Sequence, residues 1–185
     1  MNFGQKSALL EKLYHETKCE SFVETGTYEG RMVAYAVQAI GAKVVRSIEL
    51  NEHLAELATT AFRGFEHVKI VQGDSNVELV NVMSDPMVTR PLIWLDAHWS
   101  DGKTSRSSNG KDTPISEELQ AIRDSGKACV IAIDDIRCFD GKNGYPTFDD
   151  LVETIQTFWP KATITRDDDA IWFEASVPSG DDAAV

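Results

Sequence analysis

The sequence predicts an α/β fold in which a doubly wound, mostly parallel sheet is covered by helices on both faces. Five segments that resemble strands alternate with segments of helical periodicity, and the strand segments are continuous apolar runs. Such runs are typical of parallel sheets that are buried on both faces. Only residues 166–169 separate the last two strand segments, which is too short for a crossover helix. These two strands are therefore expected to form an antiparallel hairpin that completes a seven-stranded sheet.

The expected helices are recognised by apolar residues spaced three and four apart and by residues that begin or end a helix. An apolar stripe from Leu9 to Tyr14 marks the first helix. Gly41 is expected to end the second helix, Asn51 to cap the third, and Pro114 to open the fifth. In chain order the expected helices span 5–16, 31–40, 51–62, 74–83, 114–125 and 146–159.

The expected strands are short runs of β-branched and apolar residues. They span 20–24, 43–48, 67–71, 91–95, 128–133, 161–165 and 170–175. Trp94 and Trp172 lie within two of them and are expected in the core or on a sheet face. The stretch 97–113 is a long polar loop, which we expect to cover or select a substrate.

Length and composition indicate one globular domain, assigned to residues 1–176, followed by a flexible tail at 177–185. The chain carries 18 Lys and Arg against 30 Asp and Glu, a formal net charge of −12. Such acidity argues against nucleic acid and anionic membranes as partners. The three cysteines form neither a disulfide framework nor a zinc cluster, and Cys129 is expected to be a core thiol. Without a signal peptide or an apolar run of about 18 residues, the protein is expected in the cytoplasm.

Polar groups follow each of the first five expected strands. Because ligands of open α/β sheets bind beyond the carboxyl ends of the strands, these groups are expected to gather at one edge. The set comprises Glu24 with the turn through Gly30, Glu49, Asp74, Ser75 and Asn76, Asp96 with His98 and Trp99, and Asp134 with Asp135.

The first of these groups predicts a binding turn for a small ligand. Gly26 and Gly30 allow the backbone to approach a ligand closely, although an ordinary tight turn has the same pattern. The turn is not the G-x-G-x-x-G of dinucleotide folds, and the acidic Glu24 would repel a pyrophosphate. A positively charged ligand without phosphate fits better. Glu49, about 20 residues after the glycines, is suited to accept both hydroxyls of a ribose, or it is simply an acid at a helix entrance.

Asp96, Asp134 and Asp135 predict a cation site. Three neighbouring carboxylates repel one another unless a cation neutralises them or some are protonated. Oxygen ligands favour a hard ion such as Mg²⁺, although single acids also cap helices and turns. His98 is a candidate base or a hydrogen-bonding wall residue, and Trp99 is suited to stack on a ligand or to cover the site.

Taken together, these motifs are similar to those of the class I S-adenosylmethionine-dependent methyltransferases, whose sheet is Rossmann-like. They resemble more closely the metal-dependent O-methyltransferases of the catechol and caffeoyl-CoA type, and also a group of bacterial and phage methyltransferase-like proteins. The O-methyltransferases carry Glu-x-Gly-x-Tyr-x-Gly after strand one, as residues 24–30 do here. Further matches are Glu49 after strand two, where the family holds the ribose, and 73–76 after strand three, where it contacts adenine. The last two are Asp96-Ala-His98-Trp99 with one inserted residue and Asp134-Asp135 in place of Asp-Asn. The resemblance spans about 21–174.

The resemblance implies methyl transfer from S-adenosylmethionine to the hydroxyl of a small molecule, assisted by Mg²⁺ or another divalent ion. The metal would lie at Asp96, Asp134 and Asp135, with Asp96 and His98 as catalytic residues. The implied donor-binding residues are Glu24, Gly26, Tyr28, Gly30, Glu49, Asp74, Ser75, Asn76, His98 and Trp99.

The chain also departs from this family. Ser100 stands where the family has its catalytic lysine, Lys103 follows three residues later, and Asp135 replaces an asparagine. Lys103 and Arg137 are candidate partners of an anionic substrate group or solvated loop charges. Two other functions stay open: a non-catalytic S-adenosylmethionine- or nucleoside-binding protein of the same fold, and a metal-dependent hydrolase or sugar-modifying enzyme. A homodimer is also left open.

Overall fold

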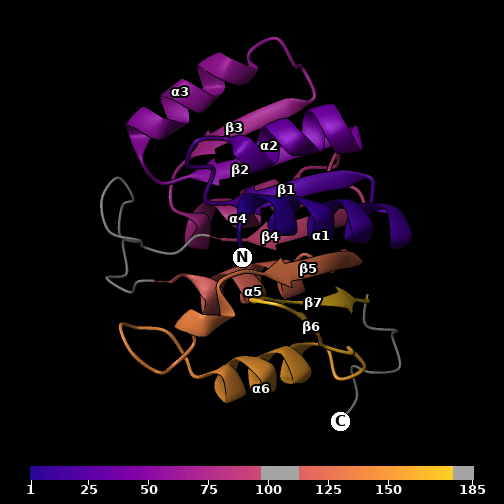
Figure 1. Cartoon of the computed structure of the whole chain (residues 1–185), viewed down its shortest axis with the longest axis vertical. Coiled ribbons are helices and arrows are strands. Elements are labelled where there is room, and N and C mark those ends of the chain that lie inside the picture. Colours follow the sequence, from indigo (N-terminus) through magenta and orange to yellow (C-terminus); the bar gives the residue numbers. More distant parts are fainter. Residues whose placement is uncertain (97–112, 177–185) are drawn as a thin grey trace.

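The computed structural model describes residues 1–96 and 113–176, and it contains the expected seven-stranded sheet (Figure 1). The strand order is β3-β2-β1-β4-β5-β7-β6; β1 to β5 are parallel, and β7 runs antiparallel to both β5 and β6. The strands are β1 Ser21–Thr25, β2 Val44–Glu49, β3 Val68–Gln72, β4 Pro91–Leu95, β5 Cys129–Ile133, β6 Thr165–Asp167 and β7 Ala170–Ala175. The predicted fold class, including the C-terminal hairpin, is confirmed.

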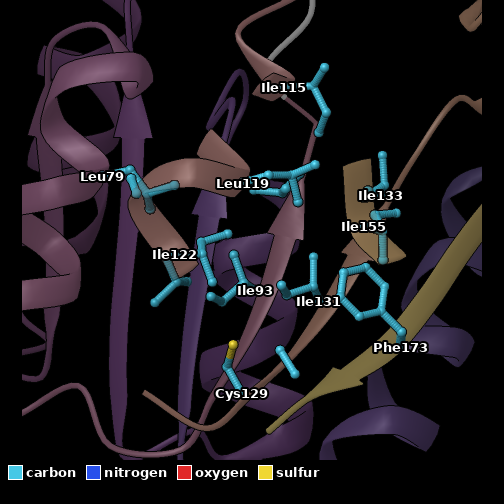
Figure 2. Close-up of a cluster of buried hydrophobic side chains, with 14 of the residues drawn as sticks. Leu79, Ile93, Ile115, Leu119, Ile122, Cys129, Ile131, Ile133, Ile155 and Phe173 are labelled. Atoms are coloured by element: carbon cyan, nitrogen blue, oxygen red, sulfur yellow. The ribbon is translucent and has the colours of Figure 1, made fainter. Parts of the chain in front are cut away.

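Helices cover both faces of this sheet. They are α1 Phe3–Glu16, α2 Arg31–Tyr35, the π-helix η1 Ala36–Ile40, α3 Glu52–Phe62, α4 Ser75–Ser84, α5 Ile115–Asp124, the 3₁₀-helix η2 Ile136–Cys138 and α6 Phe148–Phe158. Apolar residues of α1, α2 and η1 pack on one face, together with the fully buried Trp94. Residues of α4, α5 and α6 pack on the other face, where Leu119, Ile131 and Phe173 lie in one cluster (Figure 2). The predicted core thiol Cys129 belongs to this second cluster.

Side-chain caps explain where several helices begin. Asn51 caps α3 as predicted, accepting a hydrogen bond from the backbone N–H of Leu54 at 3.1 Å. A capping box of Asn2 and Gln5 starts α1 at Phe3, before the expected residue 5. A second box, from Thr147 to Asp150, starts α6 two residues later than expected from Pro146. In each case a cap that satisfies free N–H groups sets the boundary.

Two elements differ from expectation. The second helix becomes a π-helix at Ala36 before Gly41 ends it in the left-handed conformation. Strand β6 lies at Thr165–Asp167 rather than at 161–165. Asp168 adopts a positive φ of 55°, and the tight turn it forms with Asp169 makes Asp167 and Ala170 the first pair of the hairpin. This turn fixes the register and moves the paired stretch toward the C-terminus.

The described part of the chain contains no helix that is long and apolar enough to cross a membrane. Trp172 is half-buried on β7. The expected loop at 97–113 lies outside the described residues except for Thr113, and so does the expected tail at 177–185.

Candidate functional site

The carboxyl ends of β1, β2, β4 and β5 meet at one edge of the sheet. Thr25 at the end of β1 is paired with Ile48 of β2 and with Leu95 of β4, and Leu95 is paired with Ile133 of β5. The pairing of β4 with β1 continues for one residue beyond the strands, since the N–H of Asp96 donates to the Thr25 carbonyl at 3.2 Å. The predicted convergence of strand-end groups is therefore present.

The glycine turn after β1 depends on backbone conformations that favour glycine. Gly26 and Gly30 have φ of 89° and 71°, and Tyr28 has a φ of 48°. A Cβ on Gly30 would lie 2.9 Å from the ring of Phe62 on α3. Gly30 is thus required for the turn and for close packing, while Tyr28 is 43% exposed at the surface of the turn.

Glu49 binds this turn to the end of β2. One carboxylate oxygen accepts the N–H of Tyr28 at 2.8 Å, and the other accepts the N–H of Asn51 at 2.9 Å. The side chain is buried, so its position is fixed by backbone donors on both sides. A ribose at Glu49 would share these oxygens with the turn, using their second lone pairs.

Glu24 is placed differently from the expectation. It lies within β1 beneath the turn, is 2% exposed, and accepts a hydrogen bond from the hydroxyl of Ser47 at 2.8 Å. Burial raises the pKa of Glu24 well above its usual value, and the nearby Asp96 and Glu49 add to the effect. The buried carboxyl supports the turn from below through Ser47, whose hydroxyl also bonds that of Thr27.

The residues after β3 form the beginning of α4. Asp74 caps this helix and accepts the N–H of Asn76 at 3.3 Å, while Ser75 is buried. The N–H of Gly73 donates to the carbonyl of Glu49 at 2.9 Å, which holds this segment beside the end of β2. The expected adenine-contacting segment therefore adjoins the expected ribose-binding residue.

The predicted carboxylate cluster is also present. Asp96, Asp134 and Asp135 each offer an oxygen, and these oxygens lie within 4.8 Å of one another. The Asp134 side chain is fully buried, and one of its oxygens accepts the N–H of Asp135 at 2.8 Å. Asp135 has a φ of 54°, in a region that Asp and Asn tolerate better than most residues. Three oxygens at this spacing form a set that fits a hard divalent cation.

Two cations from elsewhere in the chain contact this cluster. The ammonium of Lys6 on α1 lies 3.2 Å from an oxygen of Asp96 and forms an ion pair with Asp134. Arg137 lies 2.5 Å from an oxygen of Asp135 and also pairs with Asp169 of the hairpin turn. Arg137, for which the sequence left open a role as partner of an anionic substrate group or as a solvated loop charge, pairs here with two of the protein's own acids.

Sequence reasoning missed Lys6, although the sequence does contain a signal for it. Lys6 precedes Leu9, Leu10 and Leu13 by three, four and seven residues, so it lies on the buried stripe of its helix. A lysine on such a stripe needs a partner, because burial of an unpaired ammonium is costly.

The electrostatics of the cluster follow from this arrangement. Burial and the neighbouring Asp96 raise the pKa of Asp134 to about 6, against the opposing effect of Lys6. Burial alone would lower the pKa of Lys6, but Asp96, Asp134 and Asp135 together raise it well above its ordinary value. The ammonium is therefore held charged between two carboxylates.

A small cleft, open to solvent and with room for about one water molecule, adjoins the cluster at the ends of β4 and β5. Its lining is mostly apolar and comprises Leu95, Thr113, Ile115, Glu118, Ile133, Asp134, Phe139 and Tyr145. Glu118 on α5 is 1% exposed, and burial raises its pKa to about 7. The sequence signal for Glu118 is its place between Ile115 and Ile122 on the apolar face of a helix.

Several predicted site residues cannot be placed in this geometry. His98, Trp99, Ser100 and Lys103 lie outside the described residues. Their roles as base, stacking residue or lysine substitute remain predictions.

The strand order, the antiparallel C-terminal hairpin and the glycine turn after β1 define the fold of the class I S-adenosylmethionine-dependent methyltransferases. A scan against protein-family models and a search of curated proteins found no match. Solved structures do match. The S-adenosylhomocysteine-bound methyltransferase PaMTH1 of Podospora anserina is 15% identical, with a TM-score of 0.63 over 95% of this chain and 80% of that chain.

The O-methyltransferase TomG of Streptomyces achromogenes, in complex with S-adenosylmethionine, is 14% identical, with a TM-score of 0.61 over 96% of this chain and 82% of that one. The methyltransferase domain of a bacterial Hen1, CtHen1-C, is 9% identical, with a TM-score of 0.62 over 95% of this chain and all of that domain. At these identities the likeness establishes the fold, and the activity has to be argued from the site.

Proposed function

We propose that the protein is an S-adenosylmethionine-dependent methyltransferase that methylates a hydroxyl of a small molecule. The observation that carries this proposal is the placement, at one sheet edge, of a glycine turn held by Glu49 beside a cluster of three carboxylates. The structural likeness to PaMTH1 and TomG, whose structures hold the product and the donor of methyl transfer, supports it.

The donor would lie along the ends of β1, β2 and β3. The turn between Gly26 and Gly30 allows close approach, Glu49 offers oxygens to the ribose hydroxyls, and residues 74–76 adjoin the position for adenine. S-adenosylmethionine would supply the methyl group as a cationic sulfonium. The nearby carboxylates Asp96 and Glu49 favour a cation electrostatically, and orientation of the reactants contributes much of the rate.

The carboxylate cluster has the donor set of a divalent-ion site. Asp96, Asp134 and Asp135 would hold Mg²⁺ or a similar ion, and such an ion, when bound, lowers the pKa of a nearby hydroxyl. Asp96 is the most exposed of the three and lies beside the end of β1, next to the donor-binding turn, which suits a role in positioning the acceptor.

The small cleft beside Asp134 marks where the hydroxyl of an acceptor would approach the carboxylate cluster. The mostly apolar residues around it would contact the apolar part of a small hydroxylated molecule, such as a phenol. Glu118 also lines this cleft, and because burial raises its pKa to about 7, its protonation would change near neutral pH. The overall acidity of the chain favours a neutral or cationic acceptor over a nucleic acid.

Calorimetric titration of the whole chain with S-adenosylmethionine tests this proposal. We expect Glu49→Ala to weaken donor binding by about 10- to 100-fold, because hydrogen bonds to a charged group contribute about 1.5–3 kcal/mol. Glu52→Ala, an exposed acid three residues away, is the matched control and should bind as the wild type does. Absence of donor binding by the folded wild type would overturn the proposal. Methyl transfer to a panel of phenols distinguishes an enzyme from a binding protein of the same fold.

A further inference from the structure

The N-terminal helix inserts a lysine into the carboxylate cluster. Lys6 contacts Asp96 and Asp134, two of the three residues whose oxygens form the candidate cation site. Its side chain is 18% exposed, and that of Asp134 is fully buried. The ammonium therefore takes up the space that a metal ion at these carboxylates would need, and it already balances their negative charge.

The contact is part of a wider anchoring of α1. Gln5, the preceding residue, donates to a carboxylate oxygen of Asp168 in the hairpin turn at 2.9 Å. Phe3 packs edge-on against Tyr35, the last residue of α2. The guanidinium of Arg31, the first residue of α2, lies 4.1 Å from the centre of the Phe3 ring. The first turn of α1 is thus attached to the site edge by two polar contacts and by one aromatic cluster.

A single ammonium and a divalent ion cannot both be stabilised by the same oxygens. A divalent ion needs direct contact with carboxylate oxygens, whereas the ammonium of Lys6 already contacts one oxygen of Asp96 and one of Asp134. Two cations at one position would also repel each other strongly in a partly buried setting. Occupation by one therefore requires withdrawal of the other.

We propose that Lys6 is an internal cation of this cluster that competes with a divalent ion for Asp96 and Asp134. Metal loading then releases Lys6 and loosens the first turns of α1, and the metal-free cluster is neutralised by the chain itself. The inference rests on the carboxylate cluster of the proposed function and does not depend on methyl transfer.

The test is a titration of the whole chain with Mn²⁺ alone. Binding is measured by calorimetry and by the decrease in the electron paramagnetic resonance signal of free Mn²⁺. We expect Lys6→Met to bind Mn²⁺ at least tenfold more tightly than the wild type, because the competing charge is removed while most of the side-chain volume stays. Lys12→Met, an exposed lysine on the same helix, is the matched control and should bind as the wild type does. Equal or weaker binding by Lys6→Met, or no binding by either protein, would overturn the proposal.

A second measurement covers the case in which Lys6→Met does not fold. Amide hydrogen exchange of the wild type is compared with and without saturating Mn²⁺. We expect faster exchange in residues 3–10 and unchanged exchange in α6. Binding of Mn²⁺ with no change in residues 3–10 would contradict displacement of Lys6. Because S-adenosylmethionine is absent from both measurements, failure of the donor-binding test leaves their outcome unaffected.

Discussion

The two halves of the site edge satisfy their buried acids in different ways. At β1 and β2, Glu24 and Glu49 are held by a hydroxyl and by backbone N–H groups of neighbouring segments. At β4 and β5, the three aspartates are contacted by the side chains of Lys6 and Arg137, and one backbone N–H, that of Asp135, also donates to Asp134. Backbone donors remain in place as long as the fold does, whereas a long cationic side chain can withdraw. The first half is therefore built as a fixed support, and the second half is built to exchange its cation.

Removal of one acid from the second half tests this difference most directly. We expect Asp134→Asn to abolish Mn²⁺ binding, a loss of at least about 100-fold, because the central buried ligand loses its charge. Binding of S-adenosylmethionine, measured by calorimetry on the same variant, should stay within about threefold of the wild type. Asp140→Asn, which removes an exposed acid paired with Lys142, is the control. A parallel loss of donor binding would show that the two halves act as one site.

In both halves, the features that could be predicted from the sequence are those set by where the strands end. Continuous apolar runs located β4 at 91–95 and β7 at 170–175, with the bounds that the structure has. Asn51 located the start of α3 because its cap is a local interaction. The carboxylate cluster followed from the rule that parallel strands end at one edge.

What could not be predicted are the contacts between distant segments. Lys6 and Asp96 are 90 residues apart, and their contact depends on how α1 packs across the sheet. Glu118 faces the ends of β4 and β5 only because α5 packs against that face, which periodicity alone does not specify. The raised pKa of Glu24 also follows from burial in three dimensions, since a strand-end acid in the sequence has no marker for it.

Glu118 gives a pH-dependent test at the boundary between the two halves. Its raised pKa means that the folded protein binds more protons than the unfolded chain between pH 4.5 and about 7. Stability must therefore fall as pH rises through this window. A shift of this size corresponds to about 3 kcal/mol, at 1.36 kcal/mol per pKa unit.

We expect Glu118→Gln to remove this loss, so that the variant gains about 3 kcal/mol over the wild type between pH 4.5 and pH 8. Urea denaturation at several pH values measures the difference. Glu153→Gln, on the exposed side of α6, serves as the control. A constant difference between Glu118→Gln and the wild type across this range would show that the carboxyl is not held neutral by the fold.

Arg137 provides the smallest expected effect and separates a buried competitor from an exposed one. Its side chain is 60% exposed and contacts Asp135 at the outer side of the cluster, whereas Lys6 reaches the buried Asp134. Exposed ion pairs contribute about 0–1 kcal/mol because water and salt screen them. We therefore expect Arg137→Ala to raise Mn²⁺ affinity by less than about threefold and to leave the exchange of α1 unchanged. An increase as large as that of Lys6→Met would mean that the net charge of the cluster, rather than occupation of its centre by Lys6, controls metal binding.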